Sequence, residues 1–426
     1  MLAEHQAAVA GGVFLAAYAF IVSEKLHRTL VAISGAVVLI LLGVLTQQQA
    51  IAAIDFGTIG LLIGMMIIVA VARRSGVFEY AAIRAVKSTG GDPRRMLVVL
   101  GAVTALASAL LDNVTTVLLI APVTFSIADE LDIDVIPFLF TEIMASNIGG
   151  TATLVGDPPN IMIGSATGLG FVDFLVNLGP AVLVVFVLTT AATLWWFRHA
   201  LRVEEEARGR VLALAEREAI KDWALVKQSV LVVAVTVCGF LVHQYVGLEP
   251  ATVALAGASL LLLVSRAQPE EILLGVEWPT IFFFTGLFIL VGGLEQAGII
   301  AAAAREALQV SGGNLAASAV LVLWFSALAS AFVDNIPFVA TMIPLLKSMG
   351  QMGGVPLEPL WWSLALGACL GGNGTLVGAS ANVVVAGLSE KRGRRITFAE
   401  YFRVGFPAML LSMALCTGYV YLVYLR

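Results

Sequence analysis

Long apolar runs recur along the whole chain of 426 residues. A helix needs about 20 apolar residues to cross the hydrocarbon layer of a bilayer. The runs predict membrane helices at 7–23, 29–46, 57–72, 97–128, 136–165, 172–197, 228–247, 250–265, 279–294, 315–346, 361–387 and 404–425. The fold class expected from this pattern is an all-α polytopic membrane protein.

Four of these runs are interrupted by polar residues. The runs 97–128 and 315–346 each carry an Asp-Asn pair near the middle, and 136–165 and 361–387 contain glycine-rich polar stretches. We interpret the first two as hairpins and the other two as broken helices. The pattern leaves open whether each hairpin is re-entrant or a pair of full crossings.

The interruptions recur at a constant spacing. Asp112-Asn113 returns as Asp334-Asn335 after 222 positions, and the string 153–156 (TLVG) returns at 375–378. This repeat predicts two halves, 1–197 and 228–426, joined by a polar linker at 198–227. An odd number of crossings separates the halves, so we expect them to be inverted in the membrane. Inverted repeats with interrupted helices in matching positions mark the substrate site of secondary transporters.

Composition and charge placement agree with a membrane protein. Hydrophobic residues make up 59% of the chain and charged residues 12%, against about 25% charged residues in soluble domains. With the N-terminus outside, 21 of the 24 Lys and Arg fall in inner loops, as the positive-inside rule requires. We therefore expect a multi-pass protein of the plasma membrane. We interpret the linker as a solvated cytoplasmic connection.

The broken helices offer backbone groups and neutral side chains to a solute. Glycine pairs and the Asp-Pro-Pro sequence at 157–159 interrupt helical hydrogen bonding, and free backbone groups are not tolerated against lipid. They must therefore line a cavity or be buried in protein. The residues predicted to bind substrate are Asp112, Asn113, Asn147, Gly149, Gly150, Thr151, Thr153, Asn160, Asp334, Asn335, Asn373, Thr375, Ser380 and Asn382.

Four acids lie inside otherwise apolar runs and are candidates for coupling protons or cations: Asp112, Asp157, Asp334 and Glu142. Intramembrane acids usually face the interior and serve an ion path. Asp112 and Asp334 also fit the N-cap of a following half-helix, and the two roles are compatible. Asp157 occurs in one half only, opposite Ala379, which suits a single coupling site. Glu142 has an alternative location near the inner surface.

Three motifs resemble the ion transporter superfamily: the run 54–66 (IDFGTIGLLIGMM), the run 111–116 (LDNVTT), and the stretch from Asn147 to Asn160. The resemblance covers nearly the whole chain. It is strongest to the group of arsenite efflux permeases, NhaD-type sodium/proton antiporters and the pigment-cell P protein. It implies scaffold helices and a transport part in each half, two sites near the hairpin tips and an elevator-like cycle. The dicarboxylate branch typically carries Ser-Asn-Thr at its tips, so the acids here disfavour a carboxylate substrate.

The first functional hypothesis is proton-coupled efflux of arsenite or antimonite, because a neutral trihydroxide suits a site without basic residues. Sodium/proton antiport is the alternative, since carboxylates and carbonyls suit a hard cation. An anion pathway ranks third. The chain shows no Walker motif, metal-ligand cluster or nucleophile-base constellation, so we predict neither an enzyme nor a cofactor, only a proton or sodium as coupling ion. The expected partners are a small inorganic solute and the bilayer, not nucleic acid. The resemblance also implies a homodimer and, for arsenite efflux, a soluble ATPase subunit.

Overall fold

A computed structural model describes the chain apart from residues 1, 24, 202–207, 210–211 and 213–214. Every regular element in the described part is a helix. The first half contains α1 (Leu2–Ser23), α2 (Arg28–Leu41), α3 (Gln47–Ala52), α4 (Phe56–Arg74), α5 (Val77–Lys87), α6 (Pro93–Ser108), α7 (Asn113–Leu131), α8 (Ile136–Thr151), α9 (Pro158–Thr167) and α10 (Phe171–Trp196).

The second half repeats this order. After the short helix η1 (Glu216–Ala219) it contains α12 (Trp223–Val242), α13 (Pro250–Ser265), α14 (Pro269–Leu273), α15 (Trp278–Gln296), α16 (Ile299–Ser311), α17 (Leu315–Phe332), α18 (Asn335–Gly353), α19 (Glu358–Gly371), η2 (Gly372–Gly374), α20 (Ser380–Lys391) and α21 (Phe398–Tyr424). Eight of the described helices are long and apolar enough to cross a membrane. The expected all-α polytopic fold is confirmed.

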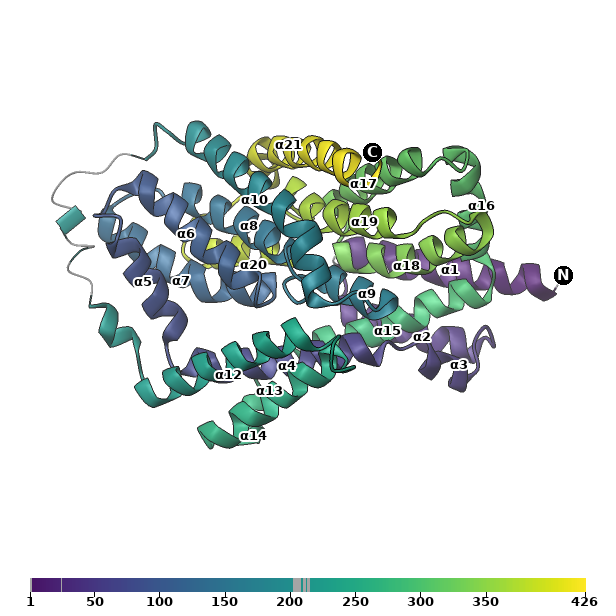
Figure 1. The fold of residues 1–426 in the computed structure, drawn as a ribbon, viewed down its shortest axis with the longest axis horizontal. Helices are drawn as coiled ribbons and strands as arrows, with labels where there is room; N and C mark the ends of the chain where they lie inside the picture. Colours follow the sequence, from purple (N-terminus) through teal and green to yellow (C-terminus); the bar gives the residue numbers. More distant parts are fainter. Residues whose placement is uncertain (1, 24, 202–207, 210–211, 213–214) are drawn as a thin grey trace.

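The two halves interlock rather than sit apart. Helix α4 packs on α13 and its repeat mate α15 packs on α2, so each of these helices pairs with the other half. The same exchange joins α7 to α20 and α18 to α9. In Figure 1 the pair α6 and α7 lies toward one end of the molecule and α17 and α18 toward the other, while α10 and α21 run side by side along one edge. The arrangement supports the predicted inverted repeat.

Two glycines set the closest of these crossings. A Cβ on Gly64 would lie 2.7 Å from the carbonyl carbon of Ala254, and one on Gly286 would lie 2.6 Å from that of Ala32. The two contacts are equivalent in the repeat, because Gly286 stands 222 positions after Gly64 and Ala254 stands 222 positions after Ala32. Small residues allow this approach of helix backbones in membrane bundles. The repeat in the sequence is therefore a repeat in the packing as well.

Part of the predicted linker is packed against the first half, which differs from a purely solvated connection. Lys221 donates its backbone N–H to the carbonyl of Ser75 at 3.0 Å, and Lys87 pairs with Glu216 at 2.5 Å. A Cβ on Gly76, whose φ is +81°, would lie 1.8 Å from the carbonyl oxygen of Ala219. Polar contacts of this kind leave no hydrophobic periodicity, so the sequence did not reveal them. The remaining residues of the linker include those outside the described part.

Candidate functional site

The Asp-Asn pairs lie where the helices of each hairpin meet. Asp112 caps α7, because its carboxylate accepts from the N–H of Thr115 at 2.8 Å and from the Thr115 hydroxyl at 2.5 Å. Asp334 caps α18 and accepts from the N–H of Ile336 at 3.1 Å. Asn113 and Asn335 follow as buried first residues of these helices. Capping satisfies amides that the helix itself leaves free.

The broken helices are held by asparagine side chains. The Asn160 amide donates to the carbonyls of Thr151 and Thr153 at 3.0 and 2.9 Å. Asn382 repeats this role, donating to Gly372 and Thr375 at 2.7 and 2.9 Å. These are the carbonyls that lose their helical partners where α8 and α19 end. Both asparagines are fully buried, so their amides replace the missing backbone donors.

Hydroxyls and glycines fix each broken helix against its hairpin. Thr153 donates to the carbonyl of Ala109 at 2.5 Å and Thr375 donates to that of Ala331. A Cβ on Gly149 would lie 2.1 Å from the Ala105 carbonyl oxygen. A similar contact, 2.6 Å from the carbonyl oxygen of Gly156, excludes a side chain at position 150. The Thr151 hydroxyl is likewise occupied, donating to the carbonyl of residue 147 at 2.7 Å.

A bridge of amides joins the two halves. Asn147 donates to the side-chain oxygens of Asn373 and Asn382 at 2.9 and 3.0 Å and accepts from Asn113 at 3.1 Å. Its repeat mate is Cys369, whose thiol donates to Asn160 at 3.5 Å. These side chains are buried and hydrogen-bonded to one another, so they hold the broken helices together, although the amide nitrogen of Asn373 has no partner.

Between the hairpin tips lies a small cavity of about 30 Å³, which we call the central space. Three carboxylates face it, from Asp112, Asp157 and Glu277. Its other polar lining residues are Arg28, Asn113, Thr280, Asn335 and Ser380. Asp157 precedes α9 and is 1% exposed, with Asn335 as a weak donor at 3.4 Å to both oxygens. Glu277 precedes α15 and accepts from Thr280 at 3.2 Å.

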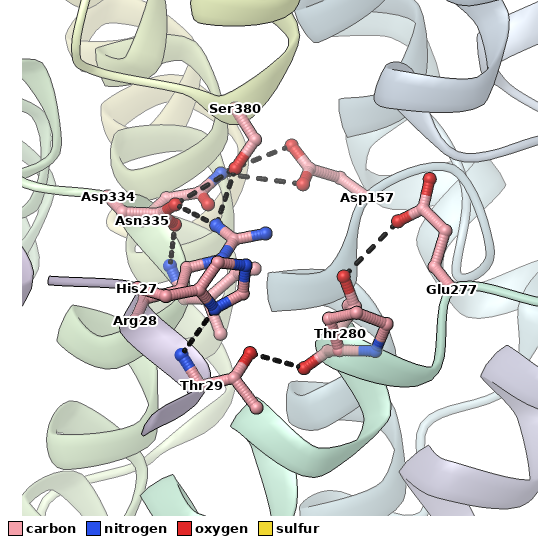
Figure 2. A network of polar contacts seen from close by, with 11 residues as sticks. His27, Arg28, Thr29, Asp157, Glu277, Thr280, Asp334, Asn335 and Ser380 are labelled. Atoms are coloured by element: carbon pink, nitrogen blue, oxygen red, sulfur yellow. Dashed lines mark hydrogen bonds and ion pairs between the residues drawn. The ribbon is translucent and has the colours of Figure 1, made fainter. Parts of the chain in front are cut away.

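Arg28, the first residue of α2, brings a positive charge to this region. Its guanidinium donates to the Asp334 carboxylate at 2.9 Å and to the Ser380 hydroxyl at 2.8 Å, and Ser380 donates to Asp334 at 3.0 Å. Figure 2 shows Asp334 on one side of the guanidinium and Asp157 and Glu277 on the other. The breaks themselves contain no basic residue, as the sequence indicated, but Arg28 of α2 brings one to the central space. The sequence-based argument that an acid at the hairpin tip repels a carboxylate substrate also does not apply at Asp334, because Arg28 neutralises its charge.

The predicted site residues thus separate into two groups. Asp112, Asn113, Asp157, Asn335 and Ser380 line the central space, whereas Asp334 lies outside that lining and is paired with Arg28, which does line it. A second group builds the breaks and lies outside that lining: Asn147, Gly149, Gly150, Thr151, Thr153, Asn160, Asn373, Thr375 and Asn382.

Glu142 also lies outside the central space. It is fully buried in α8 and accepts a hydrogen bond from the Thr124 hydroxyl of α7, while its second oxygen has no partner. The side chain is therefore enclosed by protein, and the two locations predicted for Glu142 along the membrane normal stay predictions.

Sequence reasoning missed Arg28, Glu277 and Thr280. The repeat could have revealed Glu277 and Thr280, because they stand 222 positions after Asp55 and Thr58 and are equivalent to them in the second half. Thr58 donates to Asp55 at 2.7 Å, as Thr280 does to Glu277. Arg28 has no such signal, since its repeat mate is Pro250.

A family model described as a citrate transporter matches residues 18–367. The chain belongs to this family. An uncharacterized transporter of Mycobacterium tuberculosis is 46% identical over 98% of both chains, and a 46 kDa membrane protein of Mycobacterium leprae is 44% identical over 97% of this chain and 98% of the relative. The human P protein is 35% identical over 99% of this chain, which spans 60% of that protein. The resemblance to the ion transporter superfamily and to the P protein is confirmed.

One solved structure agrees with the fold. The YdaH transporter of Alcanivorax borkumensis, described as having an unusual topology, superimposes with a TM-score of 0.55 over 86% of this chain and 84% of its own. At 14% identity this likeness concerns the fold alone. Together with the family match it identifies a multi-span membrane transporter.

Proposed function

We propose that this chain is a secondary transporter that exchanges a small monovalent cation, with sodium as the first candidate, against protons at the central space. The observation that carries the proposal is the convergence of Asp112, Asp157 and Glu277 on one cavity of about 30 Å³. Oxygen ligands suit hard cations. Carboxylates that face each other away from bulk water also repel strongly unless a cation or proton neutralises them.

The size of the central space supports an ion over a larger solute. One water needs about 10–15 Å³ of such volume, so the cavity has room for about two waters. A citrate molecule does not fit this volume, although the family description names citrate. In the described state, a cation or a proton carried by water matches the space better than a tricarboxylate.

Arsenite efflux, the first hypothesis from the sequence, receives less support from the geometry. That hypothesis needs neutral hydroxyls and amides free to bind a trihydroxide. The amides of Asn160 and Asn382 and the hydroxyls of Thr153 and Thr375 instead donate to backbone carbonyls. The hydrogen-bond geometry therefore favours sodium/proton exchange over arsenite efflux. Arsenite efflux stays a prediction and is tested in parallel.

The test is transport by purified protein in proteoliposomes with a pH-sensitive dye inside. Sodium, potassium, arsenite and citrate are added in parallel to vesicles with an acidic interior. We expect sodium to drive proton movement and Asp157→Asn to reduce it at least about tenfold, because the variant loses a charge that faces the ion. Asp222→Asn is the matched control, since Asp222 caps α12 away from the central space and asparagine caps equally well. Proton movement with arsenite or citrate and none with sodium would refute the proposal.

A further inference from the structure

Arg28 stands between two cavities. One is the central space, and the other is an open cavity of about 310 Å³ beside the α1–α2 connection, which we call the side cavity. Arg28 and Ser380 line both cavities, whereas Asp334 lines only the side cavity. The cluster of Arg28, Asp334 and Ser380 is therefore the partition between them.

The partition joins parts of the molecule that are distant in sequence. Arg28 begins α2, which packs on α15, and its guanidinium lies 5.0 Å from the centre of the Phe283 ring on α15. Its hydrogen-bond partners belong instead to the tip of the α17–α18 hairpin and to the start of α20. A movement of the hairpin tip away from α2 must separate this ion pair.

The other half lacks such a partition. Pro250 takes the position of Arg28 in the repeat, and Asp112 takes that of Asp334. Within the described part of the chain no ion pair to Asp112 is found, and its carboxylate caps α7 by accepting from Thr115. The cavity beside Pro250, of about 270 Å³, shares no lining residue with the central space. The charged cluster of Arg28 and Asp334 therefore lies beside one of these two cavities only.

We propose that Arg28, while paired with Asp334, is a tethered cation that closes the path from the side cavity to the central space, and that a transported cation must displace it from this carboxylate to reach the central space. This inference rests on the proposed cation exchange for the identity of the competitor. With the guanidinium on Asp334, that carboxylate is neutralised without a bound ion. An arriving cation must displace Arg28, so the affinity of the site falls by the fraction of molecules in which the pair is open.

The first test compares the sodium concentration that gives half-maximal exchange in wild type, Arg28→Gln and Arg74→Gln. Arg74 is the matched control, because it forms an exposed pair with Glu271 at 2.9 Å. If the pair is open in about one molecule in ten, its removal lowers the half-maximal concentration about tenfold. An unchanged or higher value in Arg28→Gln, with exchange still measurable, overturns the competition.

A second test needs no transported ion. Ile336→Cys places a thiol in the central space and Val383→Cys places one in the side cavity, both in a Cys238→Ser background because Cys238 is exposed. A charged, water-soluble thiol reagent should label Cys at 336 at least about tenfold faster when Arg28 is Gln, by the same population argument, and label Cys at 383 equally in both backgrounds.

The two tests separate failure of this inference from failure of the proposed function. Equal labelling at 336 with and without Arg28 overturns the gate, whatever ion is carried. Faster labelling at 336 in a protein that shows no sodium-driven proton movement keeps the gate and refutes the proposed exchange. Loss of folding in Arg28→Gln is excluded when the variant is recovered as monodisperse protein in detergent with an unchanged unfolding temperature.

Discussion

Replacing Asn160 by aspartate tests whether the neutral groups of the breaks are structural or bind substrate. The substitution keeps the shape of the side chain but removes the amide that donates to the carbonyls of Thr151 and Thr153 at 3.0 and 2.9 Å. A buried polar group left without a partner costs about 1–3 kcal/mol. Two such carbonyls therefore predict a loss of about 2–6 kcal/mol, a large part of a total stability of about 5–15 kcal/mol.

The assay is thermal unfolding of the purified protein in detergent, followed by the recovery of monodisperse protein after heating. Asn382→Asp should lose as much, because it breaks the equivalent bonds to Gly372 and Thr375. Asn314→Asp is the control, since Asn314 caps α17 by accepting from the N–H of Ala317 and aspartate accepts equally well. A stable Asn160→Asp protein with a changed substrate preference would refute the structural interpretation and revive the sequence-based one.

Three further predictions follow from the packing. Gly149→Ala should destabilise the protein by about 1–3 kcal/mol or more, because the added methyl group overpacks against the backbone of α6; thermal unfolding in detergent measures this loss. Gly387→Ala is the control and should be neutral or stabilising, because a Cβ there meets no atom within 4 Å. The hydrogen bond from Lys87 lowers the pKa of Glu216. The docking of η1 should therefore be intact above the pKa of about 4.3 that glutamate has in an unfolded chain, and it should be lost as the pH falls through the lower pKa of the folded state. Faster proteolysis at 215–222 would report this loss. Glu142→Gln should retain cation-driven proton movement in proteoliposomes, because Glu142 lies outside the central space. Loss of that movement in a folded variant would return Glu142 to the coupling path.

The sequence predicted the repeat and the locations of the breaks because both are written in local composition. Glycine pairs and the prolines after Asp157 disrupt a helix wherever they stand, and an Asp-Asn pair in an apolar run has few structural roles besides a cap. The structure has helix ends at these places, and α6 and α7 meet at Asp112 as α17 and α18 meet at Asp334. Patterns of this kind need no knowledge of distant contacts.

The hydrogen-bond and ion-pair partners of polar side chains could not be predicted from the sequence. Asn160 was predicted to bind substrate because its amide adds a neutral donor and acceptor to the break, yet its partners are carbonyls seven to nine residues away. Arg28 was counted among the basic residues of the inner loops because of the orientation chosen for the chain, yet its carboxylate partner lies 306 positions along the chain. A repeat search would have found Glu277 from Asp55, but it has no means of finding Arg28.

The repeat and its exceptions have different roles. Residues with a mate in the other half, such as Asn160 and Gly149, close the breaks and set the packing in both halves alike. The residues without an equivalent mate bring charge to one side: Asp157 stands opposite Ala379, and Arg28 opposite Pro250. Two equivalent halves alone would give their two opposite arrangements equal energies. An ion pair that forms in only one of these arrangements makes their energies unequal. Separating the pair costs free energy, and the other half has no equivalent pair to separate. The unmatched charges therefore make two such arrangements unequal in energy, whereas the gradients of the transported species set the direction of net transport.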